Sequence, residues 1–231
     1  MTRRGKALII VTVIVIGSLA LAGVFSRHTP PTPEPVVVEP VGPVITVAID
    51  PGHGGRDPGG VVGDVLEKDL NLGIVNRLAS LVDAQPGLRA VLTRTTDVTV
   101  DNELRLKLAE GAGAVLYLSV HINSFDDPSV HGAETLVDDT RAQDDPSWKL
   151  AESVQNAVIA ATEARDRGVR SQGLYLQHTT LPAVSAEVGF LTSTEERAKL
   201  LDPAYQDKIA QGLLQGILDY LHATGKLKEQ V

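Results

Sequence analysis

The stretch Val44-Ile45-Thr46-Val47-Ala48-Ile49-Asp50-Pro51-Gly52-His53-Gly54-Gly55 is an apolar run that ends abruptly in a glycine-rich turn. A β-branched run of this kind, bounded by proline and glycine, is typical of a strand that is buried on both faces. The glycines of the turn allow positive φ angles and a close approach of other groups to the main chain. Since ligands gather at the carboxyl ends of strands in open α/β sheets, the stretch predicts a first strand that delivers His53 to a functional site.

The composition of the chain limits both its size class and its chemistry. With 231 residues, of which 43% are apolar, the chain can form one well-cored domain but not two large ones. The formal net charge of -8 argues against a broad basic face for nucleic acid. Because the chain has no cysteine, any metal would have to be bound by His, Asp or Glu.

Residues 1–25 have the pattern of a signal-anchor or a signal peptide. Basic residues within Met1–Lys6 precede an uninterrupted apolar segment from Ala7 to Phe25. A bilayer span needs roughly 17 to 25 such residues, and the basic end stays in the cytoplasm. The triplet Ala20-Leu21-Ala22 resembles a cleavage site, so a secreted protein is the alternative. We favour the uncleaved anchor, which would tether an extracytoplasmic domain to the membrane on its periplasmic or cell-wall side.

The segment that follows, residues 26–43, is rich in proline. It contains six prolines among Val, Thr and Glu residues. Proline favours the extended polyproline II conformation and removes backbone donors, which makes such a segment a semi-rigid spacer. We therefore expect a linker at 26–43, a catalytic domain at 44–225 and a short C-terminal tail at 226–231.

Beyond the first strand, apolar runs alternate with segments of helical periodicity. This alternation predicts a single three-layer α/β domain, in which a mostly parallel, twisted sheet is flanked by helices on both faces. The expected helices are residues 64–84, 102–110, 146–164, 193–201 and 203–224, and the expected strands are residues 88–94, 114–123, 132–137, 174–177 and 183–188.

Four side chains of this pattern could meet at one edge of the sheet. His53 follows the first strand, Glu67 opens the next helix and His121 ends the apolar strand 114–123. Two imidazoles and a carboxylate are a common catalytic zinc set that leaves a fourth position for water. Glu187 lies in a strand of small and apolar residues, where a carboxylate is costly unless it has a partner or a function, so it could be the general base. Taken alone, Glu67 would be an ordinary acid in the first turn of a helix.

Structural roles remain open for several of these residues. His121 could be a hydrogen-bonded histidine of the core. Glu187 could instead pair with a buried arginine such as Arg94 or Arg105. The dipeptide Arg56-Asp57 could orient His53 or the substrate, or it could be only a structural pair in the turn.

An ordered set of motifs in the chain resembles the zinc-dependent N-acetylmuramoyl-L-alanine amidases, the amidase-3 type of cell-wall hydrolases. Each motif is modest by itself, but together they occur in the order of the family and extend over nearly the whole domain. The resembling stretches are Ile49-Asp50-Pro51-Gly52-His53-Gly54-Gly55-Arg56-Asp57-Pro58-Gly59, Glu67-Lys68-Asp69-Leu70-Asn71-Leu72, Leu92-Thr93-Arg94, Leu118-Ser119-Val120-His121-Ile122-Asn123-Ser124 and Ala186-Glu187-Val188-Gly189-Phe190-Leu191.

This resemblance implies a specific reaction and roles for four residues. His53, Glu67 and His121 match the family's ligands for one Zn²⁺ ion. Glu187 matches its catalytic glutamate. The implied activity is hydrolysis of the amide bond between N-acetylmuramic acid and the L-alanine of the stem peptide in peptidoglycan, by zinc-activated water with a glutamate general base.

Two positions depart from the family pattern, and two other functions stay open. Gln177 stands where relatives often have an arginine, and Thr192-Ser193 replaces a frequent Ser-Asn, which affects the expected substrate contacts but not the metal site. The alternatives are a zinc carboxypeptidase or aminopeptidase acting on cell-wall peptides, and a non-catalytic wall-binding protein with the same fold. Beyond peptidoglycan and the membrane, the sequence identifies no partner, and it does not show whether a protein activator is needed.

Overall fold

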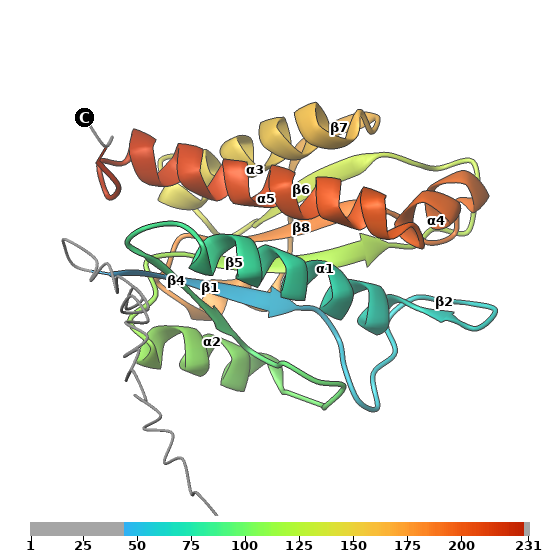
Figure 1. Cartoon of the computed structure of the whole chain (residues 1–231), viewed down its shortest axis with the longest axis horizontal. Coiled ribbons are helices and arrows are strands. Elements are labelled where there is room, and N and C mark those ends of the chain that lie inside the picture. Colours follow the sequence, from blue (N-terminus) through green and yellow to red (C-terminus); the bar gives the residue numbers. More distant parts are fainter. Residues whose placement is uncertain (1–43, 229–231) are drawn as a thin grey trace, which may run out of the picture. The chain divides into compact units, whose positions relative to one another are not determined.

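The computed structural model of the chain describes residues 44–228 (Figure 1). The expected signal-anchor at 1–25 and the linker at 26–43 lie outside these residues, as do the last three residues of the tail. Among the helices of the described part, none is both long enough and apolar enough to cross a membrane.

The described residues form a mixed α/β domain around a six-stranded sheet. The sheet has the strand order β4-β1-β5-β8-β6-β7, in which β4, β1, β5 and β8 are parallel and β6 is antiparallel to β8. The elements are β1 (Ile45–Pro51), β2 (Val61–Val62), β3 (Val65–Leu66), α1 (Glu67–Asp83), β4 (Leu88–Leu92), α2 (Asn102–Gly111), β5 (Tyr117–Asn123), β6 (Ala133–Asp138), α3 (Pro146–Thr162), β7 (Asp166–Gln172), the 3₁₀ turn η1 (Tyr175–His178), β8 (Ala183–Phe190), α4 (Thr194–Leu200) and α5 (Pro203–Ala223).

The structure confirms the predicted α/β class and the mostly parallel sheet, with three corrections. The helix expected from residue 64 begins at Glu67, because the short strands β2 and β3 pair over residues 61–66. The strand expected at 174–177 is the 3₁₀ turn η1. The edge strand β7 at Asp166–Gln172 was not predicted at all. Its sequence Asp-Arg-Gly-Val-Arg-Ser-Gln has only one apolar residue, because an edge strand is partly exposed and its ladder hydrogen bonds do not require apolar side chains.

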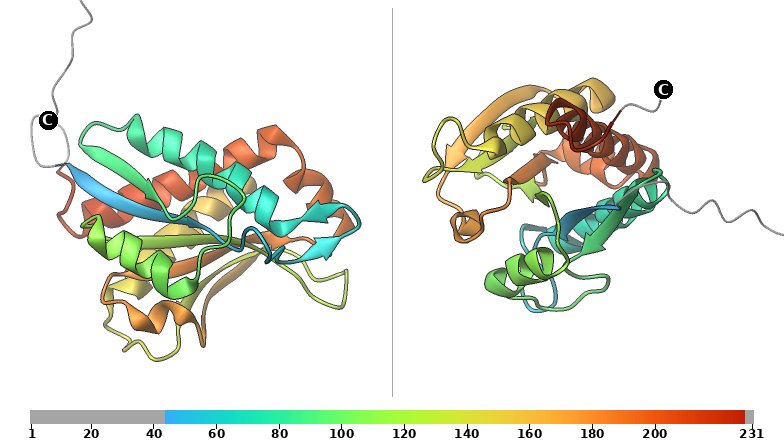
Figure 2. Two further views of the ribbon diagram at one scale, coloured as in Figure 1. Left: turned by 90° about the horizontal axis from the view of Figure 1, so that it is seen from below. Right: turned by 90° about the vertical axis from the view of Figure 1, so that its left-hand side faces the viewer.

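The two faces of the sheet are covered unequally. Helices α1, α3 and α5 pack on one face, where they build the main apolar core with alternate residues of the strands (Figures 1 and 2). On the opposite face lies the single helix α2, which contacts β1 and η1. A small second core forms there from Ala48, Leu106, Tyr117 and Leu176 with their neighbours. The second face therefore has room for a site beyond α2.

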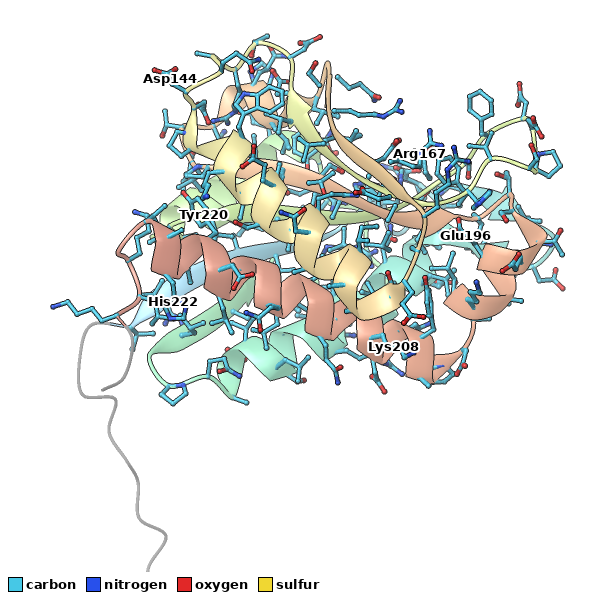
Figure 3. All side chains as sticks on the ribbon, turned by 90° about the horizontal axis from the view of Figure 1, so that it is seen from above. Asp144, Arg167, Glu196, Lys208, Tyr220 and His222 are labelled. Carbon is cyan, nitrogen blue, oxygen red and sulfur yellow. The ribbon has the colours of Figure 1, made fainter. Side chains whose placement is uncertain are left out.

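Helix α5 approaches α3 closely through two glycines. A Cβ atom at Gly216 would lie 2.6 Å from Cα of Val154, and one at Gly212 would lie 2.9 Å from Cα of Val158. Because these neighbours are backbone atoms, they can give way only if the helices separate. The two glycines therefore set the distance between α3 and α5. Figure 3 shows α5 from its outer side, with Lys208, Tyr220 and His222 labelled along it.

We expect Gly216→Ala to lower the free energy of unfolding by about 1–3 kcal/mol, because the added methyl group overpacks the α3–α5 contact. Gly111→Ala is the matched control, since nothing lies within 4 Å of its Cβ position at the end of α2. The control should be neutral or stabilising by up to about 1 kcal/mol. Urea denaturation of both variants tests this expectation, and equal stability of the two would contradict it.

Candidate active site

The turn after β1 holds its histidine in a left-handed backbone conformation. His53 has φ 61°, and Gly54 and Gly55 follow with φ 128° and 59°. The sequence suggested positive φ for the glycines, but the histidine itself also adopts it. Left-handed backbone is unfavourable for a residue with a Cβ and persists only where the surroundings enforce it.

Two buried arginines hold the carbonyl groups of this turn. Arg94 donates from Nε to the carbonyl of Pro51 and from Nη2 to that of Gly52, both at 2.9 Å. Arg105 donates from Nη1 to the carbonyl of Pro51 at 3.0 Å and from Nη2 to that of His53 at 2.6 Å. These contacts enforce the conformation of the turn.

Asp50 is the buried counter-charge beneath the turn. It is fully buried, and Oδ1 accepts from Nη1 of Arg105 at 2.5 Å and from the Thr93 hydroxyl. Oδ2 accepts from the Ser119 hydroxyl at 2.6 Å. Burial by itself would raise the pKa of Asp50, but the charge of Arg105 and these hydrogen bonds outweigh it and hold the pKa below its usual range. Asp50 is therefore ionised and links β1 to the neighbouring segments.

His53, Glu67 and His121 converge at the carboxyl ends of β1 and β5. Nε2 of His53 and Nδ1 of His121 each lie 3.1 Å from Oε1 of Glu67. The second ring nitrogen of His53, Nδ1, lies 2.8 Å from Oδ2 of Asp57. Asp57 thus orients the His53 ring, one of the two roles that the sequence left open, and turns Nε2 toward Glu67.

Glu67 is the first residue of α1, yet its side chain turns into the domain and is buried. Oε2 accepts from the backbone N–H of Gly60 at 2.8 Å. Oε1 accepts from the backbone N–H of Ile122 at 3.1 Å and from Nδ2 of Asn71 at 3.2 Å. The side chain is therefore held in place from three segments of the chain, which a solvated acid in the first turn of a helix would not require.

The charges of this cluster are strongly coupled. Burial opposes the charged forms of both Glu67 and His53. Hydrogen bonds with His121 and His53 nevertheless keep the pKa of Glu67 well below its usual range. The hydrogen bonds and charges of Glu67 and Asp57 outweigh the burial of His53 and raise its pKa to about 9. Binding of a metal ion to these atoms would require His53 to be neutral, so it would be coupled to loss of a proton.

The geometry of the three side chains fits a zinc ion. Their ligand atoms all lie within 4.8 Å of one another. Tetrahedral zinc with bonds of 2.0–2.1 Å places its ligand atoms roughly 3.3 Å apart, close to the two observed separations of 3.1 Å. Glycine is required around them, because a Cβ at Gly52 would lie 2.2 Å from the ring of His121 and one at Gly59 would lie 2.5 Å from Oε2 of Glu67.

Glu187 lies beside this cluster on β8. It is the register partner of His121 on β5 and of Glu134 on β6, so the three side chains share one face of the sheet. Burial raises the pKa of Glu187 to about 7. Among the ion pairs of residues 44–228, none joins Glu187 to Arg94 or Arg105. The alternative role of Glu187, as the partner of one of these arginines, is therefore not found, and both arginines bind the turn after β1.

A cavity of about 480 Å³ opens over this face of the sheet. His53, His121 and Glu187 line it together with Asp50 and Arg105, and other walls come from the loop before α2, from β6 and from the segment 172–176. Metal-ligating side chains, a carboxylate with a raised pKa and an open cavity are the parts that metal-assisted hydrolysis needs.

The N-acetylmuramoyl-L-alanine amidase family matches residues 47–219 of the chain. The chain belongs to this family. The resemblance found in the sequence motifs is therefore confirmed, and the chain is an enzyme of the amidase class that acts on peptidoglycan.

Individual relatives agree with this assignment. The N-acetylmuramoyl-L-alanine amidase LytC of Bacillus subtilis is 35% identical over 210 residues, which are 89% of this chain but only 42% of LytC. The germination-specific amidase of the same organism is 33% identical over 78% of this chain and 81% of its own length. The crystal structure of an N-acetylmuramoyl-L-alanine amidase from Clostridium difficile 630 superposes with a TM-score of 0.76 at 35% identity, over 80% of this chain and 100% of that one.

Several contacts of the amidase site were not predicted from the sequence. Asp50 and Arg105 are 55 positions apart in the sequence, so their ion pair could not be predicted from the spacing of charged residues. Tyr175 lines the cavity and donates to Oδ2 of Asp50 at 3.2 Å. Gln177, where relatives often have an arginine, is exposed on η1 and donates to the carbonyl of Leu174 at 3.3 Å.

We expect Asp50→Asn to lower the free energy of unfolding of the amidase by about 3–5 kcal/mol at pH 7, because it leaves Arg105 buried without its counter-charge. The sign of the pH dependence follows from the lowered pKa of Asp50. Its stabilisation is complete above the unfolded pKa of about 3.9 and is lost as the pH falls through the folded value. Denaturant unfolding between pH 3 and pH 7 should therefore show a difference between the wild type and Asp50→Asn that shrinks in acid.

Asp101→Asn is the control for the loss of one negative charge near the same cavity. Asp101 is exposed at the start of α2 and makes no side-chain cap. Its replacement should change stability by no more than about 0.5 kcal/mol. A pH-independent difference for Asp50→Asn would show that the effect does not come from its ionisation.

Proposed function

We propose that this domain hydrolyses the amide bond between the lactyl group of N-acetylmuramic acid and the L-alanine of the stem peptide, with one zinc ion and Glu187. The observation that carries the proposal is the cluster of His53, Glu67 and His121, whose two histidines line one cavity together with Glu187, in a chain of the amidase family.

The zinc ion would be held by Nε2 of His53, Oε1 of Glu67 and Nδ1 of His121. When bound, it polarises the scissile carbonyl and lowers the pKa of a water molecule, so that hydroxide is available near neutral pH. The protein's own contribution is to fix these ligands. Asp57 sets the orientation of the His53 ring, and the backbone donors of Gly60 and Ile122 fix the carboxylate of Glu67.

Glu187 would act as the general base and then as the general acid. Its carboxylate takes a proton from the attacking water and passes it to the leaving amine when the tetrahedral intermediate collapses. A pKa of about 7 suits both steps, because the group can accept and release a proton near neutral pH. One side chain can therefore serve both halves of the reaction.

We expect the wild-type protein to release stem peptides with a new amino-terminal L-alanine from purified peptidoglycan, leaving glycan without peptide. Glu187→Gln should lower this rate by roughly 10²–10⁴-fold, because the proton transfer loses its acceptor. The Gln side chain should leave the zinc content unchanged. Mass spectrometry of the digest and elemental analysis of the protein measure the two quantities, and a chelator should abolish the activity of the wild type.

Two further variants separate the roles. His53→Ala should lose both zinc and activity, whereas Glu195→Gln changes an exposed acid on α4 and should affect neither. Undiminished hydrolysis by Glu187→Gln would disprove its role as the base. Release of a terminal amino acid in place of new N-terminal alanine would identify a carboxypeptidase or aminopeptidase, and bound zinc without any turnover would favour a wall-binding protein.

We also infer that residues 1–25 anchor the domain in the cytoplasmic membrane, with the site of action outside the cytoplasm. The support is the basic start and the apolar run Ala7–Phe25, and the extracytoplasmic position of peptidoglycan. The full chain should sediment with membranes and resist extraction by salt, whereas a chain that begins at Val44 should not. Full-length protein found only in the soluble fraction would contradict the anchor.

A further inference from the structure

The edge strand β7 places two arginines next to the amidase cavity. Arg167 and Arg170 both lie on it, in a chain with a net charge of -8. The side chain of Arg167 is labelled in Figure 3. The guanidinium of Arg167 stacks over the ring of Phe190 at 4.9 Å, which fixes its plane at the end of β8.

The register of the sheet shows that Arg170 shares a face with the reaction centre. Arg170 is the partner of Leu136 on β6, and Leu136 is the partner of Ser185 on β8. Leu136 and Ser185 line the cavity, as does Gln172, which lies two residues beyond Arg170 on the same face of β7. Since neighbouring strands are about 4.8 Å apart, β7 lies roughly 10 Å from β8 and its Glu187.

Both arginines already bind one carboxylate, that of Glu134. Nε of Arg167 lies 2.8 Å and Nε of Arg170 3.3 Å from Oε2 of Glu134. Glu134 is buried and also accepts from Nδ2 of Asn123 at 3.0 Å through Oε1. Glu134 thus holds Arg167 by a hydrogen bond to Nε and Arg170 by an ion pair, while Nε of Arg170 donates to the carbonyl of Arg167 at 3.4 Å.

The remaining guanidinium nitrogens are available to a ligand. Within residues 44–228, the terminal nitrogens of Arg167 and Arg170 have no hydrogen-bond acceptor. The side chain of Arg170 is 55% exposed, whereas that of Arg167 is 18% exposed. Two neighbouring guanidinium groups with free terminal donors are suited to a carboxylate, which they can bind with charge-assisted hydrogen bonds.

We propose that Arg170, supported by Arg167, forms a carboxylate subsite for the stem peptide. The inference rests on the proposed function, because it places the scissile bond at Glu187. A peptide extended from there toward β7 advances about 3.3–3.6 Å per residue, so the residue after L-alanine comes within reach of the arginine side chains. The subsite selects stem peptides in which this residue carries a free carboxylate over those in which it carries a carboxamide.

The test uses two synthetic muramoyl dipeptides in which the γ-carboxyl group of the glutamate is blocked as the methylamide: N-acetylmuramoyl-L-alanyl-D-glutamate γ-methylamide, which has a free α-carboxylate, and its α-carboxamide. We expect the wild type to cleave the carboxylate form with a kcat/KM about tenfold higher. In Arg170→Gln the ratio of the two kcat/KM values should fall to about one, while kcat/KM for the carboxamide stays unchanged. Arg170→Lys keeps the charge without the planar donors and should retain only part of the preference.

Arg165→Gln is the matched control. Arg165 is exposed in the turn before β7 and makes no contact with Glu134, so the same loss of charge should leave the ratio unchanged. An unchanged ratio in Arg170→Gln would overturn the proposal. Equal losses on both substrates would also overturn it, because they would show that Arg170 only maintains the structure around Glu134.

A binding measurement separates this inference from the proposed function. Isothermal titration with the product L-alanyl-D-glutamate γ-methylamide and its α-carboxamide needs no turnover. The wild type should bind the carboxylate about tenfold more tightly, and Arg170→Gln should bind both equally. If the wild type cleaves neither muramoyl dipeptide but keeps this preference in binding, the proposed reaction fails and the subsite stands. If the preference is missing, the subsite fails.

Discussion

The structure depends on one buried ion pair, Asp50 with Arg105, at the carboxyl end of β1. A buried pair is favourable only when its remaining donors and acceptors are also satisfied. Here Asp50 accepts hydrogen bonds from hydroxyl groups of three neighbouring segments, and Arg105 also donates from Nη1 and Nη2 to carbonyls of the turn. The pair therefore joins the sheet, helix α2 and the backbone of His53 in a single network, and the unfavourable φ of His53 is sustained by it.

The second constraint is the pairing register of the central strands. Because β5 and β8 are parallel and adjacent, His121 and Glu187 become direct neighbours on one face. A shift of either strand by one residue would turn one of these side chains into the apolar core on the other face. Val120, next to His121 on β5, and Val188, next to Glu187 on β8, belong to that core. The same burial that stabilises the sheet thus fixes the distance between His121 and Glu187.

The sequence predicted the parts of this arrangement that have a local pattern. Strands β1, β5 and β8 are nearly continuous apolar runs. His53 follows β1, His121 lies on β5 and Glu187 lies on β8, so the approach of these three residues could be expected from the sheet topology. The partners of the buried arginines could not be predicted, since Arg105 meets Asp50 only after α2 has folded back over the sheet. Strand β7 was missed for a related reason. Its register is set by hydrogen bonds to β6 and not by an apolar pattern.

The reversal of strand direction between β8 and β6 gives the site its asymmetry. On the β1 side, the cavity is bounded by α2 and by loops whose glycines leave space around His121 and Glu67. On the other side, β6 and β7 carry Glu134 and two arginines on the face that no long helix covers. Buried Glu134 would repel Glu187 if it were unpaired, because the two are register partners. The two arginines that offset the charge of Glu134 also have free terminal donors. The same side chains can therefore stabilise the buried carboxylate and bind a carboxylate of the substrate.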